Sequence, residues 1–245
     1  MKILLKGVIS IEELQPLYDK SIECLHCKEP STTKKIRSRF IKVARYDTDF
    51  CPIYKNPTAN ALYYYIHVCP HCGFSFSEDF SRYFPPTTQE DIEEKVCSKW
   101  NPHHFSDERS IEDAIKTYKL ASYCGALKKE KHIIQAGILL RIAWLYRFQK
   151  KQEQEKRFLK LALLEYEASY STGDFSGTQV SEVRILYLAG DISKRIGNTQ
   201  AAVKYFSMVL ERQKNAMEAS IIKMARDRWH EIKEESVTSN LAAHA

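Results

Sequence analysis

The chain has 245 residues, of which 44% are hydrophobic and 28% charged, and its formal net charge is +6 at pH 7. These values are ordinary for a soluble globular protein, and the charge is too small to indicate a nucleic-acid binder by itself. No run of about 18 apolar residues occurs, so no membrane span is predicted. The length predicts two structural units.

The cysteines indicate the compartment. The residues from Met1 to Gly7 are too short an apolar start for a secretory signal, so we expect a cytoplasmic protein. In a reducing compartment thiols bind metals more often than they pair. The odd count of seven cysteines also argues against a complete disulfide framework.

Residues 1–105 contain six of the seven cysteines and predict a small β-rich domain. A capping box at Ser10 to Glu13 predicts a first short helix. The alternation of basic and apolar residues from Ile36 to Tyr46 predicts a half-exposed strand. The aromatic run from Leu62 to Val68 favours a second strand. The fold class expected for the whole chain is therefore α+β, with the helices following the strands.

A connector follows at Tyr83 to His104. Pro85 and Pro86 cannot lie inside a helix. Thr87 and Glu90 are placed to cap a short helix that would run to about Trp100, where Asn101-Pro102 ends it.

Residues 106–236 have apolar side chains at helical spacing and predict an all-α domain, with a frayed tail at 237–245. Six helices are expected, at 110–127, 131–149, 152–171, 178–196, 199–213 and 215–235.

The helices expected at 178–196 and 199–213 resemble the tetratricopeptide pattern. The small pair Ala189-Gly190 precedes the turn at Gly197-Asn198, and Ala202, Phe206 and Val209 share a face of the following helix. Small residues let two antiparallel helices approach closely, and an aromatic ring fills the space between them. A degenerate copy precedes this one. The alternative is a helical bundle without repeats.

The strongest chemical signal is a pair of Cys-x-x-Cys motifs, formed by Cys24, Cys27, Cys69 and Cys72. Two intervening residues let one tight turn present both sulfurs to one ion, and two such turns complete a tetrahedron. Four thiolates leave no open coordination position, so the predicted Zn²⁺ is structural. The alternative is four unrelated buried thiols.

The other thiols and imidazoles are weaker candidates. Cys51 is interpreted as a buried small hydrophobe, with a redox thiol or a substitute ligand as alternatives. Cys97 and Cys124 are expected to pack in the core. His26 and His71, inside the two motifs, are expected to be exposed to solvent.

Together with the two Cys-x-x-Cys motifs, three further segments make the chain resemble a bacterial family of unknown function. The resemblance lies in Tyr18-Asp19-Lys20, in the segment from Arg45 to Cys51 and in the segment from Val68 to Phe74, and it extends over roughly residues 15–235. It implies a bacterial cytoplasmic protein that joins a zinc-ribbon-like N-terminal region to tetratricopeptide-like repeats. Leu25 stands where the family usually has proline.

Three classes of function remain. A protein-binding adaptor is favoured, because stacked helical hairpins form a concave surface that suits a peptide or a partner helix. Nucleic-acid binding is the alternative, since a basic stretch lies near several tyrosines that could stack on bases. An enzyme is least favoured, because no phosphate-binding or nucleophile motif occurs. The partner and the oligomeric state are not determined. The basic stretch consists of Lys34, Lys35, Arg37, Arg39, Lys42 and Arg45.

Overall fold

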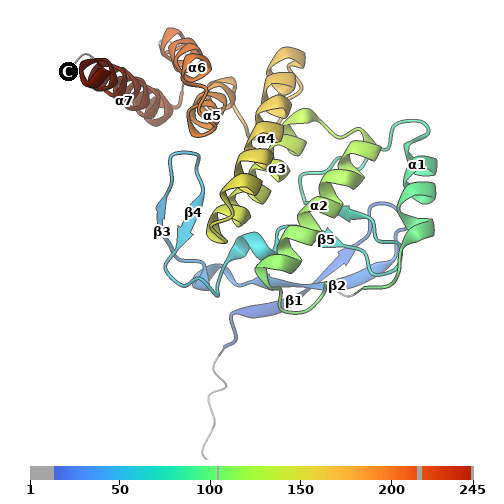
Figure 1. Ribbon diagram of the computed structural model, residues 1–245. Helices are drawn as coiled ribbons and strands as arrows, with labels where there is room; N and C mark the ends of the chain where they lie inside the picture. Colours follow the sequence, from blue (N-terminus) through green and yellow to red (C-terminus); the bar gives the residue numbers. More distant parts are fainter. Residues whose placement is uncertain (1–13, 104, 214–216, 244–245) are drawn as a thin grey trace, which may run out of the picture.

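The structure is a computed structural model that describes residues 14–103, 105–213 and 217–243. Its first part is built from three antiparallel strand pairs, and its second part from helices that follow one another along the chain (Figure 1). The predicted α+β class is confirmed. The capping box expected at Ser10 lies outside the described residues.

Each strand pair is a separate two-stranded sheet. Strand β1 (Leu17–Glu23) pairs with β2 (Pro30–Ile36), β3 (Val43–Tyr46) with β4 (Pro52–Tyr54), and β5 (His67–Val68) with β6 (Ser75–Phe76). Each pair is joined by a short turn. The turns of the first and third pairs carry the two Cys-x-x-Cys motifs, so the hairpins present the sulfurs.

The single strand predicted from Ile36 to Tyr46 is wrong. Strand β2 ends at Ile36, a 3-10 turn η1 (Ser38–Phe40) follows, and β3 begins only at Val43. The break places the Ile36 side chain in a small apolar cluster with Ala59 and Tyr64, against which Phe40 and Ile41 pack. Packing against residues distant in the sequence therefore overrides the local alternation.

Most of the strand predicted at Leu62 to Val68 is also wrong. Residues Ala61–Tyr64 form the 3-10 helix η2, and only His67–Val68 is strand. The Asn60 side chain accepts a hydrogen bond from the Leu62 amide at 3.0 Å and starts the helical turn. The buried Arg109 donates to the carbonyl oxygens of Tyr63 at 3.0 Å and Ile66 at 2.8 Å. These hydrogen bonds satisfy the backbone carbonyls that a sheet would otherwise pair, so the segment forms a 3-10 helix and a turn although its residue types favour strands.

In the connector, α1 (Thr88–Lys95) and the 3-10 turn η3 (Cys97–Lys99) stand where one short helix was expected. The predicted cap at Thr87 is wrong, because this residue has φ 68° and its side chain bonds no helix amide. The Thr88 hydroxyl instead donates to the Pro85 carbonyl at 2.7 Å.

All six helices predicted after residue 106 are present: α2 (Ile111–Lys128), α3 (His132–Phe148), α4 (Gln152–Thr172), α5 (Glu182–Arg195), α6 (Thr199–Glu211) and α7 (Ala219–Ala243). Helix α5 begins four residues after the predicted start, because the Ser181 side chain caps it by accepting from the Arg184 amide at 3.1 Å. Helix α7 continues beyond the predicted end at 235.

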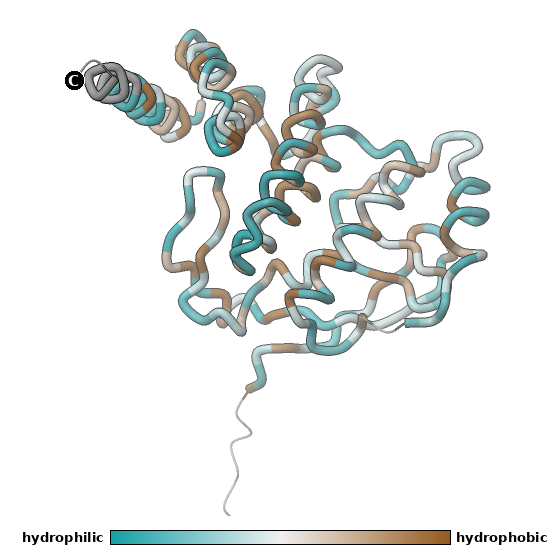
Figure 2. Tube along the Cα trace, viewed as in Figure 1, coloured by the Kyte–Doolittle hydropathy of each residue, from teal (hydrophilic) through white to brown (hydrophobic). Residues whose placement is uncertain are grey.

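Each helix from α2 to α7 packs against the next one in chain order. Hydrophilic and hydrophobic residues alternate along these helices, as expected for helices with one buried side (Figure 2). Helix α3 lies at the centre, since its buried residues cover most of its circumference. One continuous apolar core joins the hairpins to the helices, and it contains Cys51 and Phe74 together with Leu145 and Tyr187.

Candidate metal centre

The first Cys-x-x-Cys motif lies in the turn between β1 and β2. The Cys24 amide donates to the Glu29 carbonyl at 3.1 Å, and the Lys28 amide donates to the Cys24 carbonyl at 3.1 Å. Lys28 takes φ 65°, a conformation that usually requires glycine. Its ammonium group donates to the Leu25 carbonyl at 2.8 Å. The turn thus forms with lysine at position 28, where such a conformation favours glycine. It also forms with leucine at position 25 in place of the proline expected there.

The second motif, between β5 and β6, has the same backbone pattern. The Cys69 amide donates to the Phe74 carbonyl at 3.0 Å, and the Gly73 amide donates to the Cys69 carbonyl at 2.9 Å. Gly73 has φ 73°, and a Cβ atom there would lie 2.4 Å from the Trp100 ring. The Trp100 indole N–H donates to the Pro70 carbonyl at 2.9 Å. Glycine is therefore required at 73 for both conformation and space.

The two turns bring the four sulfurs together. The Sγ atoms of Cys24 and Cys72 are 3.7 Å apart, and those of Cys27 and Cys69 are 3.6 Å apart. A regular tetrahedron with metal–sulfur bonds of about 2.3 Å has edges of about 3.8 Å. A disulfide needs about 2.05 Å, so the separations fit ligands of one ion and not a bonded pair. The four cysteines could hold a metal ion.

The electrostatics of this group favour a cation. Cys24, Cys69 and Cys72 are buried, and Cys27 is half-buried. The neighbouring sulfurs of Cys24 and Cys69, together with burial, raise the pKa of the Cys72 thiol far above its ordinary value. A bound divalent cation would stabilise the thiolate forms of the four cysteines.

A second group of possible ligands lies beside the first. Atoms of His26, Glu93 and Cys97 all lie within 4.8 Å of one another, and His26 Nε2 is 3.2 Å from a Glu93 oxygen. The expectation that His26 is exposed is wrong, because its side chain is only 10% exposed. The Phe74 and Phe84 rings cover it, with centroids 5.8 and 6.1 Å from the imidazole. His71, by contrast, is exposed as expected.

Of the other thiols, Cys51 and Cys124 are buried and Cys97 is half-buried. Cys51 lies in the turn between β3 and β4 and is not one of the four clustered cysteines. Burial and the neighbouring Asp49 raise its pKa well above the ordinary range. The thiol is therefore the weakly reactive, protonated form at neutral pH.

The predicted basic stretch is divided by the fold. Lys34 pairs with Asp19 at 2.8 Å, and Lys35 pairs with Glu78 at 2.7 Å. The Arg37 guanidinium lies over the Tyr18 ring, 4.9 Å from its centroid. These contacts partly neutralise one end of the stretch. Its other members, Arg39, Lys42 and Arg45, are exposed.

A buried carboxylate joins the β3–β4 turn to the helices. Asp49 is 0% exposed. Its side chain accepts from the Trp144 indole N–H at 2.8 Å and from two nitrogens of Arg147 at 2.7 and 3.1 Å. This bidentate, charge-assisted contact is a strong one. It connects residues about 100 positions apart, which no local spacing reveals.

The same turn also contacts α5. The Tyr187 hydroxyl donates to the Thr48 carbonyl at 2.8 Å. Arg195 donates to the Thr48 hydroxyl at 2.6 Å and pairs with Asp47 at 3.0 Å and with Asp191 at 2.7 Å. The helices thus hold the turn through its backbone and through both of its acidic side chains. The segment from Arg45 to Cys51, noted above only for its resemblance to a family, was the one sequence signal for this contact.

Comparison with known protein families finds a match over most of the chain. The family model described as an uncharacterised protein conserved in bacteria, DUF2225, matches residues 17–232. No curated protein and no solved structure matches the chain. Within the described residues, no helix has the length and apolar character needed to cross a lipid bilayer.

Proposed function

We propose that this chain, which belongs to the DUF2225 family of uncharacterised proteins conserved in bacteria, is a protein-binding adaptor stabilised by a structural zinc ion. In this proposal residues 1–105 form a zinc-ribbon-like unit and residues 106–236 form a tetratricopeptide-like array. The array is the surface that recognises a protein or peptide partner.

The donor set supports zinc as the metal. Four thiolates in tetrahedral geometry are typical of Zn²⁺ or of iron–sulfur clusters, and Zn²⁺ is the common occupant of paired Cys-x-x-Cys turns. With all four positions taken by Cys24, Cys27, Cys69 and Cys72, the ion has no place for water or substrate. Its role would be to hold the two hairpin turns together.

Close packing of α5 and α6 supports the repeat architecture. A Cβ atom on Gly190 would lie 2.7 Å from the Phe206 ring, so the two helices approach at a small residue and an aromatic fills the gap. Phe206 and Ala202 are both fully buried. This is the contact expected of a tetratricopeptide-like hairpin.

One observation carries the adaptor proposal: the helices already hold a peptide segment of their own chain. The turn Asp47–Cys51 is bound by side chains of α3 and α5 through a backbone carbonyl and two carboxylates. Arginine, tyrosine and tryptophan side chains make these contacts, and the same residue types dominate protein–protein interfaces. A surface of this chemistry suits extended, acidic partner segments.

Photo-crosslinking in cells tests the proposal. p-Benzoylphenylalanine replaces Leu164, which is 61% exposed on α4, or Arg39 in the exposed part of the basic stretch. We expect position 164 to give a discrete protein adduct that resists nuclease. Position 39 should give less of this adduct. Nuclease-sensitive adducts from position 39, with none from 164, would refute the adaptor and favour nucleic-acid binding. Metal analysis of the same preparation is expected to give one zinc per chain.

Nucleic-acid binding remains the alternative proposal, with less support. Two of the six basic side chains that would carry it, Lys34 and Lys35, are engaged by carboxylates of the same chain. Release of counterions, which drives such binding, needs free cationic groups.

A further inference from the structure

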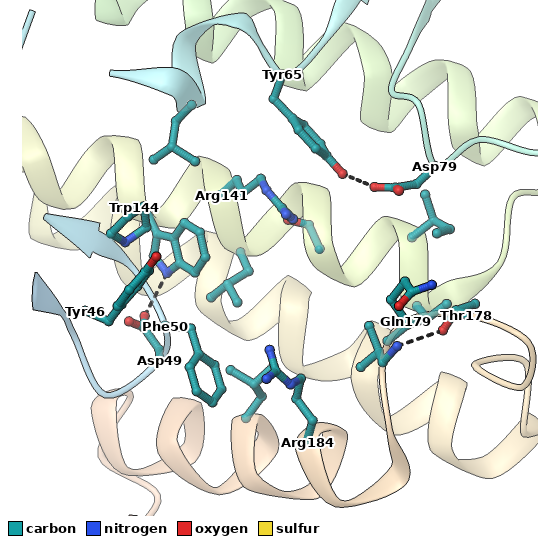
Figure 3. A pocket seen from close by; sticks show the side chains of 18 of the residues that line it. Tyr46, Asp49, Phe50, Tyr65, Asp79, Arg141, Trp144, Thr178, Gln179 and Arg184 are labelled. Atoms are coloured by element: carbon teal, nitrogen blue, oxygen red, sulfur yellow. Dashed lines mark hydrogen bonds between the residues drawn. The ribbon is translucent and has the colours of Figure 1, made fainter. Parts of the chain in front are cut away.

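A cavity of about 800 Å³ lies between the β3–β4 hairpin, helices α3 and α5, and the segment 177–180 (Figure 3). Binding sites for small molecules usually have volumes of about 300–1,000 Å³ and combine apolar walls with a few polar groups. This cavity has both features. Its walls come from separate parts of the chain, so it exists only in the folded protein.

An arginine without a carboxylate partner extends into this cavity. The Arg141 guanidinium donates one hydrogen bond to a described residue, to the Gly137 carbonyl at 2.9 Å, and forms no salt bridge with any of them. It lies 4.3 Å from the centroid of the Tyr65 ring and 5.8 Å from that of Trp144. A guanidinium has five N–H donors, so most of those on Arg141 are available to a ligand.

Two carboxylates, Asp49 and Asp79, also line the cavity near Arg141, and each accepts a hydrogen bond from another side chain. Asp79 accepts a hydrogen bond from the Tyr65 hydroxyl. Asp49 accepts from Trp144 and pairs with Arg147. Asp79 contributes a favourable charge to Arg141 but forms no salt bridge with it, so the guanidinium keeps unused N–H donors that a bound anion would accept from.

A second arginine borders the cavity from α5. Arg184 lies over the Phe50 ring, 4.6 Å from its centroid, and its side chain is 38% exposed. One of its nitrogens is 3.3 Å from a Glu218 oxygen, which leaves other donors of the guanidinium free to turn toward the cavity. Figure 3 draws Arg141 and Arg184 on opposite walls.

Flat apolar surfaces lie between the two arginines. Phe50 and Trp144 line the cavity beside them, and further apolar side chains complete its walls. Aromatic faces favour flat ligands, which stack on them. The further apolar lining residues include Val43, Tyr54, Ile134, Leu140 and Leu188.

We propose that this cavity binds a small organic anion, with its oxyanion group on Arg141 and its flat apolar body against Trp144 and Phe50. This inference goes beyond the proposed adaptor function and does not depend on it. A volume of about 800 Å³ is in the range of small-molecule binding sites. A carboxylate, a sulfonate and a phosphate all offer the paired oxygens that a guanidinium binds in bidentate geometry.

Two dyes with the same aromatic skeleton test the proposal. 8-Anilinonaphthalene-1-sulfonate carries an oxyanion, and N-phenyl-1-naphthylamine lacks it. Fluorescence titration of the full-length protein is expected to show one saturable site that binds the sulfonate more tightly than the neutral amine. Arg141→Met should weaken sulfonate binding at least tenfold, as expected for losing a charge-assisted bidentate contact, and leave amine binding unchanged.

Arg226→Met is the matched control, because Arg226 is an exposed arginine of α7 that does not line the cavity. It should leave both affinities within about twofold of wild type, a change smaller than removal of one charged contact produces. Circular dichroism checks that each variant is folded. If Arg141→Met does not fold, the comparison of the two dyes decides. Equal affinity for both dyes, or unchanged sulfonate binding in a folded Arg141→Met variant, overturns the proposal.

Discussion

Replacement of Gly190 by alanine tests how closely α5 and α6 approach. A Cβ atom at this position would lie 2.7 Å from Cε1 and 2.8 Å from Cδ1 of Phe206. Real Cβ atoms do not approach other heavy atoms so closely, so something must move. The Phe206 ring is 0% exposed and closely packed, and it has little room to yield.

The expected magnitude follows from two opposing terms. In a helix interior, alanine is more favourable than glycine by about 1 kcal/mol. Forcing an extra methyl group into a packed core costs about 1–3 kcal/mol, and the short contacts to Phe206 place this case at the upper end. Gly190→Ala should therefore lower the free energy of unfolding by about 2 kcal/mol, which for a chain of this size lowers the melting temperature by roughly 4–8 °C.

Urea unfolding of the metal-loaded protein measures the change, with Gly137→Ala as the matched control. At Gly137, in the middle of α3, a Cβ would meet only the end of the Arg141 side chain at 3.0 Å. That flexible group can shift, so this variant should be at least as stable as wild type, with a gain of up to about 1 kcal/mol. Adding Phe206→Leu should remove the penalty of Gly190→Ala, because the obstructing ring is gone. A Gly190→Ala variant as stable as wild type would refute the reasoning.

Four further predictions follow from other contacts. Chelation of the metal, or Cys69→Ser, should unfold the N-terminal hairpins, detected by amide exchange, because structural zinc supplies on the order of 10 kcal/mol. Two lysines, Lys20 and Lys35, hold the pKa of Glu78 at about 2, below its ordinary value of 4.5. The stabilisation from ionised Glu78 is thus present above pH 4.5 and lost as pH falls toward 2. Glu78→Gln should remove this part of the pH dependence of the free energy of unfolding. The change should be less than about 1 kcal/mol, because Glu78 is half-exposed. Asp49→Asn should cost about 3 kcal/mol in urea unfolding, since it removes the charge of a buried pair. Cys51 should react with iodoacetamide at pH 7 more slowly in the folded than in the unfolded protein, as peptide mass spectrometry would show, because burial raises its pKa.

The four metal ligands were predictable because their spacing is a local property. Two residues between cysteines require a tight turn, whatever surrounds it, and the same backbone hydrogen bonds form at Cys24 and at Cys69. The sequence did not predict that Lys28 would adopt the positive φ that glycine adopts in the second turn. Its ammonium group compensates by a bond to a carbonyl within the same turn.

The helices were predictable for a related reason. Apolar residues at a period of 3.6 define a buried face before any partner is known. The errors lie in the segments 36–46 and 62–68, where residue types favour strands and the structure places turns. In 62–68 the outcome depends on Arg109, which donates to carbonyl oxygens more than 40 residues earlier in the chain. In 36–46 it depends on the packing of Ile36 against Ala59 and Tyr64.

The sequence by itself determined the mixed fold class, the six helices after residue 106 and the identity of four clustered thiols, because each depends on spacing within a few residues. Only the tertiary structure decided that Asp49 is buried against Arg147 and that Arg141 extends into a cavity lined by Phe50 and Trp144. These side chains are distant in sequence. They meet because one apolar core packs the β3–β4 turn against the helices. A charge buried there is costly unless it is paired, as Asp49 is with Arg147.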